Sequence, residues 1–334
     1  MKILKTWTLL KSDANHVELS VDGKHRLNLF VLEQGMFRVL IKRENKLALN
    51  RTWSIAPEND VPWEGRNRES LEGFALPGFT MEELGDTLRI SSDKLRVTVH
   101  QPLWLEWEYL NEAAEWQFLA SDRPTSAYLL NAHGDGVAHY QRRYKEEQYY
   151  GLGEKAGPLQ RTGKRYEMRN LDAMGYNAES TDPLYKHIPF TITRRPDVSF
   201  GMFYDNLSSC WLDLGNEIDN YHLPYRRWQA ESGDVDYYIF LGPQVLDVTK
   251  AFVRLTGKTL FGPKWSLGYS GSTMHYTDAP DAQNQLMSFI KLCEEHAIPC
   301  DSFQLSSGYT SINNKRYVFN WNYDKVPQPK VMSQ

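Results

Sequence analysis

The first 245 residues repeat one pattern, in which short runs of alternating apolar and polar residues are separated by Gly, Asn, Asp and Pro. In one of these runs Phe37, Val39 and Ile41 occupy every second position, and further runs lie at 86–100, 104–110, 197–206, 209–215 and 234–242. A two-residue period puts alternate side chains on opposite faces of a strand. Because scarcely any window here has a helical period, the sequence predicts a large antiparallel β-sandwich over residues 1–245.

The pattern changes near residue 245. Residues 243–257 place their apolar side chains on one helical face and end at Gly257, a typical helix stop. After a strand-like run at 265–271 comes a helix predicted from about Pro280 to Ala297, and then a strand at 300–309. Strand, helix and strand in this order form a βαβ unit. We therefore assign residues 246–334 to a linker helix and the start of a parallel α/β domain.

Such a βαβ unit cannot cover both faces of its own sheet, and only 28 residues follow Ser306. Either another chain covers the exposed surface or the chain is a truncated product, and we favour the second interpretation. Purified alone, this chain is then expected to be poorly soluble.

Composition excludes several classes of partner. With 38 Lys and Arg against 42 Asp and Glu, the net charge of −4 gives no reason to expect nucleic acid or an anionic membrane as partner. No run approaches the roughly 20 apolar residues of a membrane-spanning helix, and the N-terminus lacks the apolar core of a signal peptide. The sequence predicts a soluble, cytoplasmic protein rather than a membrane-embedded one, and the low solubility expected above concerns only this chain purified alone.

Neither a disulfide framework nor a metal site is predicted. The three cysteines, Cys210, Cys293 and Cys300, are widely spaced and are expected to be buried, reduced thiols. His187 and His275 have no further ligand-type residue at metal-binding spacing, so we expect both to form hydrogen bonds or to lie at the surface. No cofactor is expected.

Residues 169–190 are aromatic and polar but follow neither a strand nor a helix period. Around this segment, short motifs occur in a fixed order: "YYGLGE" (149–154), "RNLD" (169–172), "DPLYKHIPF" (182–190), "GMFYDN" (201–206), "DYYIFLGP" (236–243) and "FGPKWSLGY" (261–269). Together they resemble the N-terminal half of glycoside hydrolase family 31, the α-glucosidase and α-xylosidase family. The resemblance covers residues 145–334 and, more loosely, the earlier strands.

This resemblance implies a galactose-mutarotase-like β-sandwich that leads into a (β/α)8 barrel, and retaining hydrolysis of α-glycosidic bonds. It also implies that the 169–190 segment reaches over the mouth of the barrel, where such enzymes have their active sites. Asp172 matches the family's acidic residue at the rim of the substrate pocket. An α-linked oligosaccharide or glycoside is the expected partner, and a homo-oligomeric full-length enzyme is compatible with the resemblance.

Retaining hydrolysis needs two carboxyl groups about 5 Å apart. In the family both are aspartates on loops after later barrel strands, so we expect neither catalytic residue in this chain and expect the chain to be inactive alone. Asp301 opens a predicted strand and Asp324 lies in a predicted loop, where structural roles are expected for both.

The remaining pocket positions depart from the family pattern. After the second barrel strand, family members commonly carry Asp-x-Asp-Tyr, whereas the matching run here includes Ser306 and Tyr309. After the first strand, Arg-Trp-Gly-Tyr is replaced by a run that includes Met274 and Tyr276. A serine hydroxyl holds a sugar less firmly than a carboxylate, and a thioether is no rigid stacking surface. We therefore expect a substrate sugar that is not necessarily glucose.

Two alternatives remain open. The chain contains a sandwich without a catalytic pair, so it could be a carbohydrate-binding module without catalysis. A mutarotase-type epimerase would need histidines and carboxylates paired across a concave face. Its candidates, His100, His133 and His139, lie near predicted loops without an obvious partner.

Overall fold

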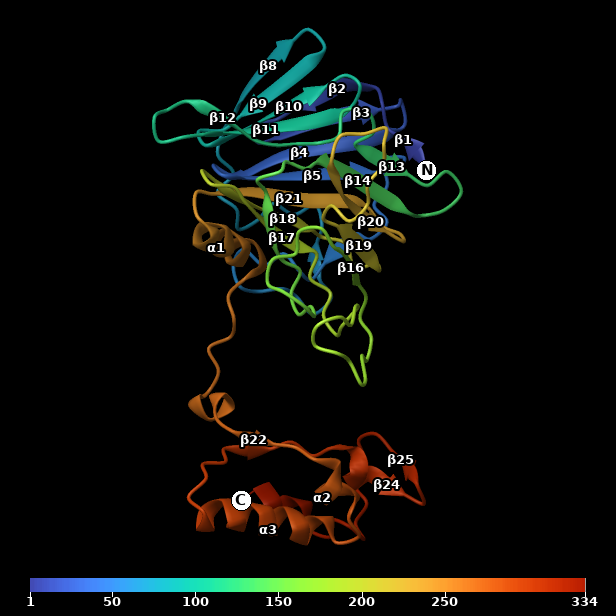
Figure 1. The fold of residues 1–334 in the computed structure, drawn as a ribbon, viewed down its shortest axis with the longest axis vertical. Coiled ribbons are helices and arrows are strands. Elements are labelled where there is room, and N and C mark those ends of the chain that lie inside the picture. The colour runs from blue at the N-terminus through green and yellow to red at the C-terminus, as the bar shows by residue number, and fades with distance from the viewer. Residues whose placement is uncertain (334) are drawn as a thin grey trace. The chain divides into compact units, whose positions relative to one another are not determined.

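The computed structural model describes residues 1–333, which are mainly β and fall into two compact units, Met1–Lys258 and Thr259–Gln334. We refer to them as unit 1 and unit 2 and describe each by itself (Figure 1). Among the described residues, no helix is long and apolar enough to cross a membrane.

Unit 1 consists of three large antiparallel sheets and one small one. The eight-stranded sheet has the order β15 (Gln148–Gly151), β17 (Phe190–Arg194), β18 (Ser199–Tyr204), β21 (Val235–Gly242), β5 (Met36–Lys42), β4 (His25–Glu33), β3 (His16–Val21), β2 (Trp7–Ser12). The six-stranded sheet has the order β1 (Lys2–Ile3), β13 (Tyr128–Leu130), β14 (Val137–Arg142), β20 (Tyr225–Ala230), β19 (Cys210–Asp213), β16 (Arg165–Met168). The five-stranded sheet has the order β12 (Trp116–Ser121), β11 (Trp104–Leu110), β10 (Leu95–His100), β9 (Thr87–Ser91), β8 (Thr80–Leu84), and β6 (Arg51–Thr52) pairs with β7 (Arg66–Asn67). The predicted antiparallel sandwich is confirmed.

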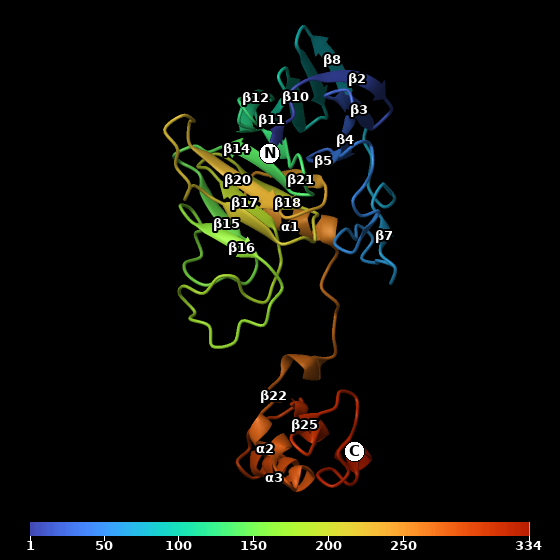
Figure 2. The same ribbon diagram turned by 90° about the vertical axis from the view of Figure 1, so that its right-hand side faces the viewer.

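The main core lies on one side of the eight-stranded sheet, between it and the other two large sheets. Phe37 meets Trp107 of the five-stranded sheet edge-on, with 5.6 Å between ring centroids. The Tyr128 and Tyr237 hydroxyls are hydrogen-bonded at 2.8 Å between the six- and eight-stranded sheets. Both views place the five-stranded sheet at one end of unit 1 and β16 with the following loop at the other (Figures 1 and 2).

The central strands of the eight-stranded sheet, β4, β5, β18 and β21, are buried on both faces. Strand β5 has Arg38 and Leu40 buried as well as Phe37, Val39 and Ile41, so its alternation does not separate a core face from a solvent face. A second apolar cluster, which includes Leu40, Ile55 and Phe240, covers the other face together with helix α1 (Val245–Thr256). Segments outside the sheets thus hide a face that alternation alone would expose to water.

Helix α1 belongs to unit 1. A capping box between Gln244 and Asp247 begins it, and Gly257, at φ 86°, ends it as predicted. Its buried residues Val248 and Leu255 join the second cluster. The domain boundary predicted near residue 245 lies before this helix, whereas the compact units divide after Lys258 because α1 packs on the sheet.

Unit 2 contains the βαβ arrangement with much shorter strands than the sequence indicates. Strand β22 (Ser270–Gly271) pairs in parallel with β23 (Ser302–Phe303), and α3 (Ala282–Glu295) lies between them in the chain. The rest of the two expected strands forms loops and the 3₁₀ helices η1 (Lys264–Leu267) and η2 (Ser307–Thr310). A pair of strands without further partners is only marginally stable, which fits the short ladder between β22 and β23.

Three further segments of unit 2 complete its description. A short helix that the sequence periodicity did not indicate, α2 (Met274–Asp278), follows β22. A hairpin of β24 (Ser311–Ile312) and β25 (Lys315–Arg316) and the 3₁₀ helix η3 (Pro329–Ser333) follow. The three cysteines are free thiols; Cys210 and Cys293 are buried as expected, whereas Cys300 is only partly buried.

Candidate functional site

The irregular segment predicted to carry Asp172 is the loop between β16 and β17, the yellow-green loop in Figures 1 and 2. Asp172 is exposed, and partial desolvation, followed by the charge and hydrogen bond of Asp172, raises the pKa of Tyr185. The Tyr176 ring meets the Tyr185 ring edge-on, with 6.4 Å between centroids. An acidic group thus lies beside two exposed aromatic rings, a combination that suits contact with a sugar.

Polar contacts anchor the base of this loop. The Lys155 ammonium group donates to Asp182 Oδ1 at 2.7 Å and also to the Glu167 carbonyl, while Asp182 Oδ2 accepts from the Glu167 amide at 2.6 Å. The imidazole Nε2 of His187 lies 3.0 Å from the Asn206 carbonyl oxygen. His187 therefore has the hydrogen-bonding role predicted for it, and the loop leaves the sheets along a fixed path.

The other four predicted site residues lie in unit 2, on the segments that follow the two parallel strands. Met274 and Tyr276 belong to α2, Ser306 is the N-cap of η2, and Tyr309 lies within η2. The two segments touch at Gly308, where a Cβ atom would come within 2.4 Å of Asp278 Oδ1. Only glycine allows this approach, which brings α2 and η2 together at the carboxyl ends of β22 and β23.

The four side chains differ in how far they are exposed to solvent and packed against other residues. Tyr276 packs against Phe289 and Phe303, at centroid distances of 5.5 and 6.4 Å, and Tyr309 packs against Trp321 at 4.7 Å. Met274 is 49% exposed, and Ser306 is half-buried. The two tyrosines thus contribute to local packing, while Met274 and Ser306 are the groups most free to meet a ligand.

The carboxylates of unit 2 have structural contacts or lie at its surface. Asp278 forms an ion pair with Arg316 at 3.1 Å. Asp301 is exposed, and its amide donates to the Tyr269 carbonyl at 2.9 Å. Asp324 is exposed, and its amide donates to Asn322 Oδ1 at 2.9 Å. These contacts fit the structural roles expected of Asp301 and Asp324.

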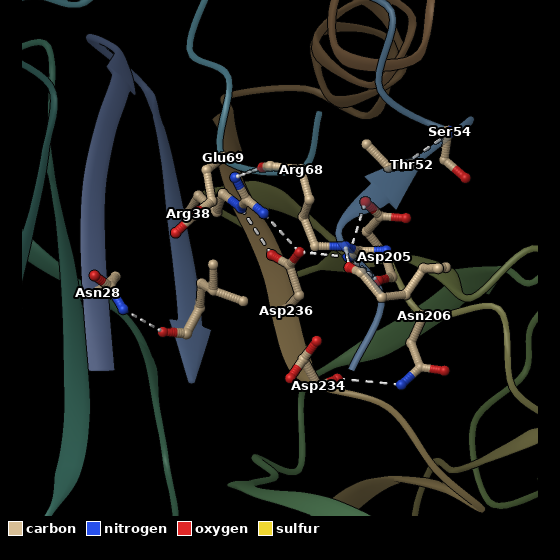
Figure 3. Close-up of polar contacts among 12 residues, drawn as sticks. Asn28, Arg38, Thr52, Ser54, Arg68, Glu69, Asp205, Asn206, Asp234 and Asp236 are labelled. Atoms are coloured by element: carbon tan, nitrogen blue, oxygen red, sulfur yellow. Dashed lines mark hydrogen bonds and ion pairs between the residues drawn. The ribbon is translucent and has the colours of Figure 1, made fainter. Parts of the chain in front are cut away.

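A buried charge cluster lies in unit 1, in a place that the sequence did not indicate (Figure 3). Asp236 accepts from Arg38 Nε and Nη2 at 2.8 and 2.7 Å and from Arg68 Nη1 at 2.7 Å. Arg68 Nη1 also lies 3.2 Å from Asp205 Oδ2, and Asp234 Oδ2 accepts from the Ala48 amide at 2.9 Å. These contacts fasten residues 48–68 to β21.

Burial separates the pKa values within this cluster. Desolvation raises the pKa of Asp205 to about 6, against the opposing charge of Arg68, and raises that of Asp234 to about 6. For Asp236, the charges and hydrogen bonds of Arg38 and Arg68 overcome desolvation and lower the pKa. Asp205 and Asp234 border a cleft of about 600 Å³.

Two carboxylates with separated pKa values resemble the acid and nucleophile of a glycosidase. The cluster does not fit that role, because Asp236 is fully buried and its oxygens are held by two arginines. A sugar carbon cannot reach such a carboxylate without breaking both ion pairs. The motifs "GMFYDN" and "DYYIFLGP" contain Asp205 and Asp236. A short motif cannot reveal the ion pair between Asp236 and Arg38, because these residues are 198 positions apart in the sequence.

One of the three histidines considered for an epimerase lies elsewhere than predicted. His139, expected near a loop without partners, lies within β14 and is fully buried. Its Nε2 is 2.7 Å from Asp122 Oδ1 and its Nδ1 is 2.9 Å from the Tyr204 hydroxyl. It therefore has a carboxylate partner, but no ligand can reach the pair. His100 stacks on Trp104 at 3.7 Å between centroids.

His275 meets the Tyr276 ring edge-on, at 5.3 Å between centroids. Within residues 1–333, no group of three or more His, Cys, Asp or Glu side chains is arranged to hold a metal ion.

Comparison with known families gives two matches along the chain. The family model described as "Glycosyl hydrolase 31 N-terminal galactose mutarotase-like domain" matches residues 26–213. The model described as "Glycosyl hydrolases family 31 TIM-barrel domain" matches residues 259–334. The two matches fall one in each compact unit.

Relatives agree with these matches. The chain is 28% identical over 283 residues to Alpha-glucosidase 2 of Bacillus thermoamyloliquefaciens, covering 79% of this chain and 34% of the relative. It is 31% identical over 206 residues to Neutral alpha-glucosidase AB of Sus scrofa, covering 56% and 21%. The chain therefore spans about a third or less of the length of these curated relatives.

The fold of the whole chain also has a counterpart among solved structures. A Flavobacterium johnsoniae GH31 dextranase in complex with isomaltotriose aligns with a TM-score of 0.75 and 23% identity, over 97% of this chain and 36% of that one. At this identity the alignment supports the fold alone.

Proposed function

Because the chain belongs to glycosyl hydrolase family 31, we propose that it forms the N-terminal part of a retaining α-glycosidase that hydrolyses α-linked glycosides. The observation that carries this proposal is the order of the two family domains, a mutarotase-like domain followed by the start of a TIM-barrel domain. The meeting of α2 and η2 after the parallel strands supports it, since loops at the carboxyl ends of barrel strands build active sites.

We propose that Asp172 contributes to the rim of the substrate pocket and that Met274, Tyr276, Ser306 and Tyr309 form part of its wall. Half-exposed Met274 and the Ser306 hydroxyl are the groups offered to the sugar. A hydroxyl binds a sugar hydroxyl more weakly than a carboxylate does. The preferred sugar is accordingly not necessarily glucose, and an α-galactoside, an α-xyloside or a modified sugar is an alternative.

The 334-residue chain alone is proposed to be inactive. The chemistry requires an ionised nucleophile and a protonated acid about 5 Å apart and open to substrate. Asp236 is sealed by arginines, and Asp278 is paired with Arg316. We therefore propose that the catalytic pair lies on further barrel strands of a longer enzyme.

The direct test is an assay of the purified 334-residue chain on nitrophenyl α-glycosides, with circular dichroism to show that it is folded. We expect no turnover from the chain and turnover from a longer gene product that carries a complete barrel. Robust hydrolysis by the 334-residue chain would contradict the proposed location of the catalytic pair.

The pocket wall is tested in that longer product. Ser306→Asp together with Met274→Trp restores the residue types common in the family, and preference is expected to move towards α-glucosides. A panel of α-linked nitrophenyl sugars measures kcat/KM for both versions. An unchanged ranking of sugars would show that these residues do not line the pocket.

A non-catalytic carbohydrate-binding module remains the second candidate, and a longer product that binds sugars without hydrolysing any of the panel would favour it. A homo-oligomeric full-length enzyme and a cytoplasmic location stay predictions.

A further inference from the structure

The outer face of the five-stranded sheet carries an ordered array of polar side chains. Directly paired residues across the strands place Thr80, Ser91, Arg96 and Glu108 in one row. A second row contains Glu82, Arg89, Thr98 and Glu106. The alternate residues, such as Val97 and Trp107, point into the main core.

A cleft of about 660 Å³ lies along this face, and its lining includes Thr80, Glu82, Arg89, Ser91, Arg96 and Trp116. Trp116, the first residue of the edge strand β12, is half-buried. The guanidinium carbon of Arg96 lies 4.4 Å from its ring centroid. Arg96 itself forms a bidentate ion pair with Glu108, in which Nε donates to Oε2 at 2.6 Å and Nη2 donates to Oε1 at 2.7 Å. The indole ring is thus held in place at the border of the cleft.

Two charged side chains of the second row, Arg89 and Glu106, are incompletely paired. The Nε atom of Arg89 is buried without a hydrogen bond, and the nearest acidic contact of its guanidinium group is Glu82 at 3.6 Å, beyond hydrogen-bonding length. Within residues 1–333, the half-buried carboxylate of Glu106 has neither a hydrogen bond nor an ion pair. Desolvation, with the nearby charge of Glu108, raises the pKa of Glu106. Glu106 is not among the residues that line the cleft, and a ligand cannot reach the buried Nε atom of Arg89. The Arg89 side chain is nevertheless 31% exposed, so its other guanidinium nitrogens can donate to a ligand in the cleft.

The charges of the cleft identify the class of ligand. Its lining contains two acids, Glu82 and Asp93, and two arginines, Arg89 and Arg96. This balance offers no net attraction to an anionic polymer or a cationic peptide. A neutral polyol suits this mixed lining, because each hydroxyl both donates and accepts, and the apolar face of a sugar ring packs against indole.

We propose that this face of the five-stranded sheet is a non-catalytic binding site for a neutral oligosaccharide chain, with Trp116 as the stacking surface and Arg89 as a hydrogen-bond donor. The site does not depend on the proposed hydrolytic function, although the choice of an α-linked glucan as probe rests on it. Binding at this face lies entirely within unit 1 and needs no residue of unit 2.

The test is a calorimetric titration of the 334-residue chain with maltoheptaose. We expect saturable binding that Trp116→Ala weakens roughly tenfold and Arg89→Gln about fivefold, each with an unchanged circular dichroism spectrum. Ser91→Arg, which places a large side chain in the cleft without removing a sheet contact, is a second blocking variant and is expected to abolish binding. Trp63→Ala is the matched control, because Trp63 is 92% exposed on the loop between β6 and β7 and lies outside the cleft lining.

Absence of saturable binding up to about 10 mM maltoheptaose would overturn the proposal. So would binding that persists at wild-type strength in folded Trp116→Ala and Ser91→Arg variants. Hydrolysis of small nitrophenyl glycosides by a longer product reports separately on the proposed function, so the two proposals fail independently.

Discussion

Unit 1 and unit 2 obtain their structure in different ways. In unit 1, strands of up to nine residues stack in three large sheets, and side chains such as Leu29, Phe37 and Trp107 are almost completely buried. In unit 2 the paired strands are two residues long, and Phe261, Leu267 and Phe319 are 101, 87 and 97% exposed. A βαβ unit can therefore obtain local structure from its helix and turns, whereas a buried core requires further layers of helices or sheets to cover its apolar faces.

The largest expected difference is in hydrogen exchange. Amides of β4, β5 and β21 should exchange only through global unfolding of unit 1, and those of β22, β23 and α3 through local opening. We expect protection factors to differ roughly ten-thousand-fold, which corresponds to about 5.5 kcal/mol in opening free energy. Hydrogen exchange monitored by mass spectrometry measures these protection factors. Equal protection factors in both units would contradict the expected difference in stability between them.

The next effect concerns the buried charges of unit 1. Arg68→Met leaves Asp205 without its ion pair and Asp236 with one arginine, and should lower the free energy of unfolding by about 3–5 kcal/mol. Lys42→Met is the control, because it removes an ion pair at 2.9 Å whose Glu69 partner is 53% exposed, and should cost less than about 1 kcal/mol. Urea unfolding measures both. Equal costs would show that burial adds nothing to the cluster.

A pH effect of intermediate size is expected from Asp205 and Asp234. Their pKa of about 6 in the folded state lies above the ordinary value of 3.8, so the folded state binds more protons between these two values. Stability should therefore be greater near pH 4 and fall as the pH rises through 6, by at most about 3 kcal/mol for each group. The lowered pKa of Asp236 acts below 3.8, outside this window.

Asp234→Asn separates the contribution of one group. In urea unfolding at pH 5, 6 and 7 the variant should show a weaker loss of stability with rising pH than the unchanged chain. A pH profile identical to that of the unchanged chain would mean that Asp234 does not titrate in this range.

The smallest expected difference comes from a matched pair of substitutions. Leu29→Ala acts in the main core of unit 1, where Leu29 is 1% exposed, and Leu286→Ala acts in α3 of unit 2, where Leu286 is 4% exposed. Leu→Ala costs about 2–5 kcal/mol, with larger values where the surroundings cannot relax. We expect Leu29→Ala to cost about 1–2 kcal/mol more, measured by urea unfolding of each unit. A larger cost in unit 2 would reverse the comparison.

Much of this molecule was determined by the sequence. The two-residue alternation predicted β5 and the β9, β10, β11, β18, β19 and β21 strands, because the order of apolar and polar residues is a property of each strand's own sequence. Gly257 predicted the end of α1, since it needs a positive φ. The ordered motifs identified the family, whose two domain models match residues 26–213 and 259–334.

Other features were decided only by the tertiary structure. The burial of Arg38, its pairing with Asp236, and the partner of His139 depend on segments that are distant in the chain and meet only when the sheets stack. The rows on the outer face of the five-stranded sheet depend on strand register, which no single strand encodes. The short lengths of β22 and β23 follow from the number of available partner strands. Local periodicity determines which face of an element is apolar, but what covers that face is a property of the whole fold.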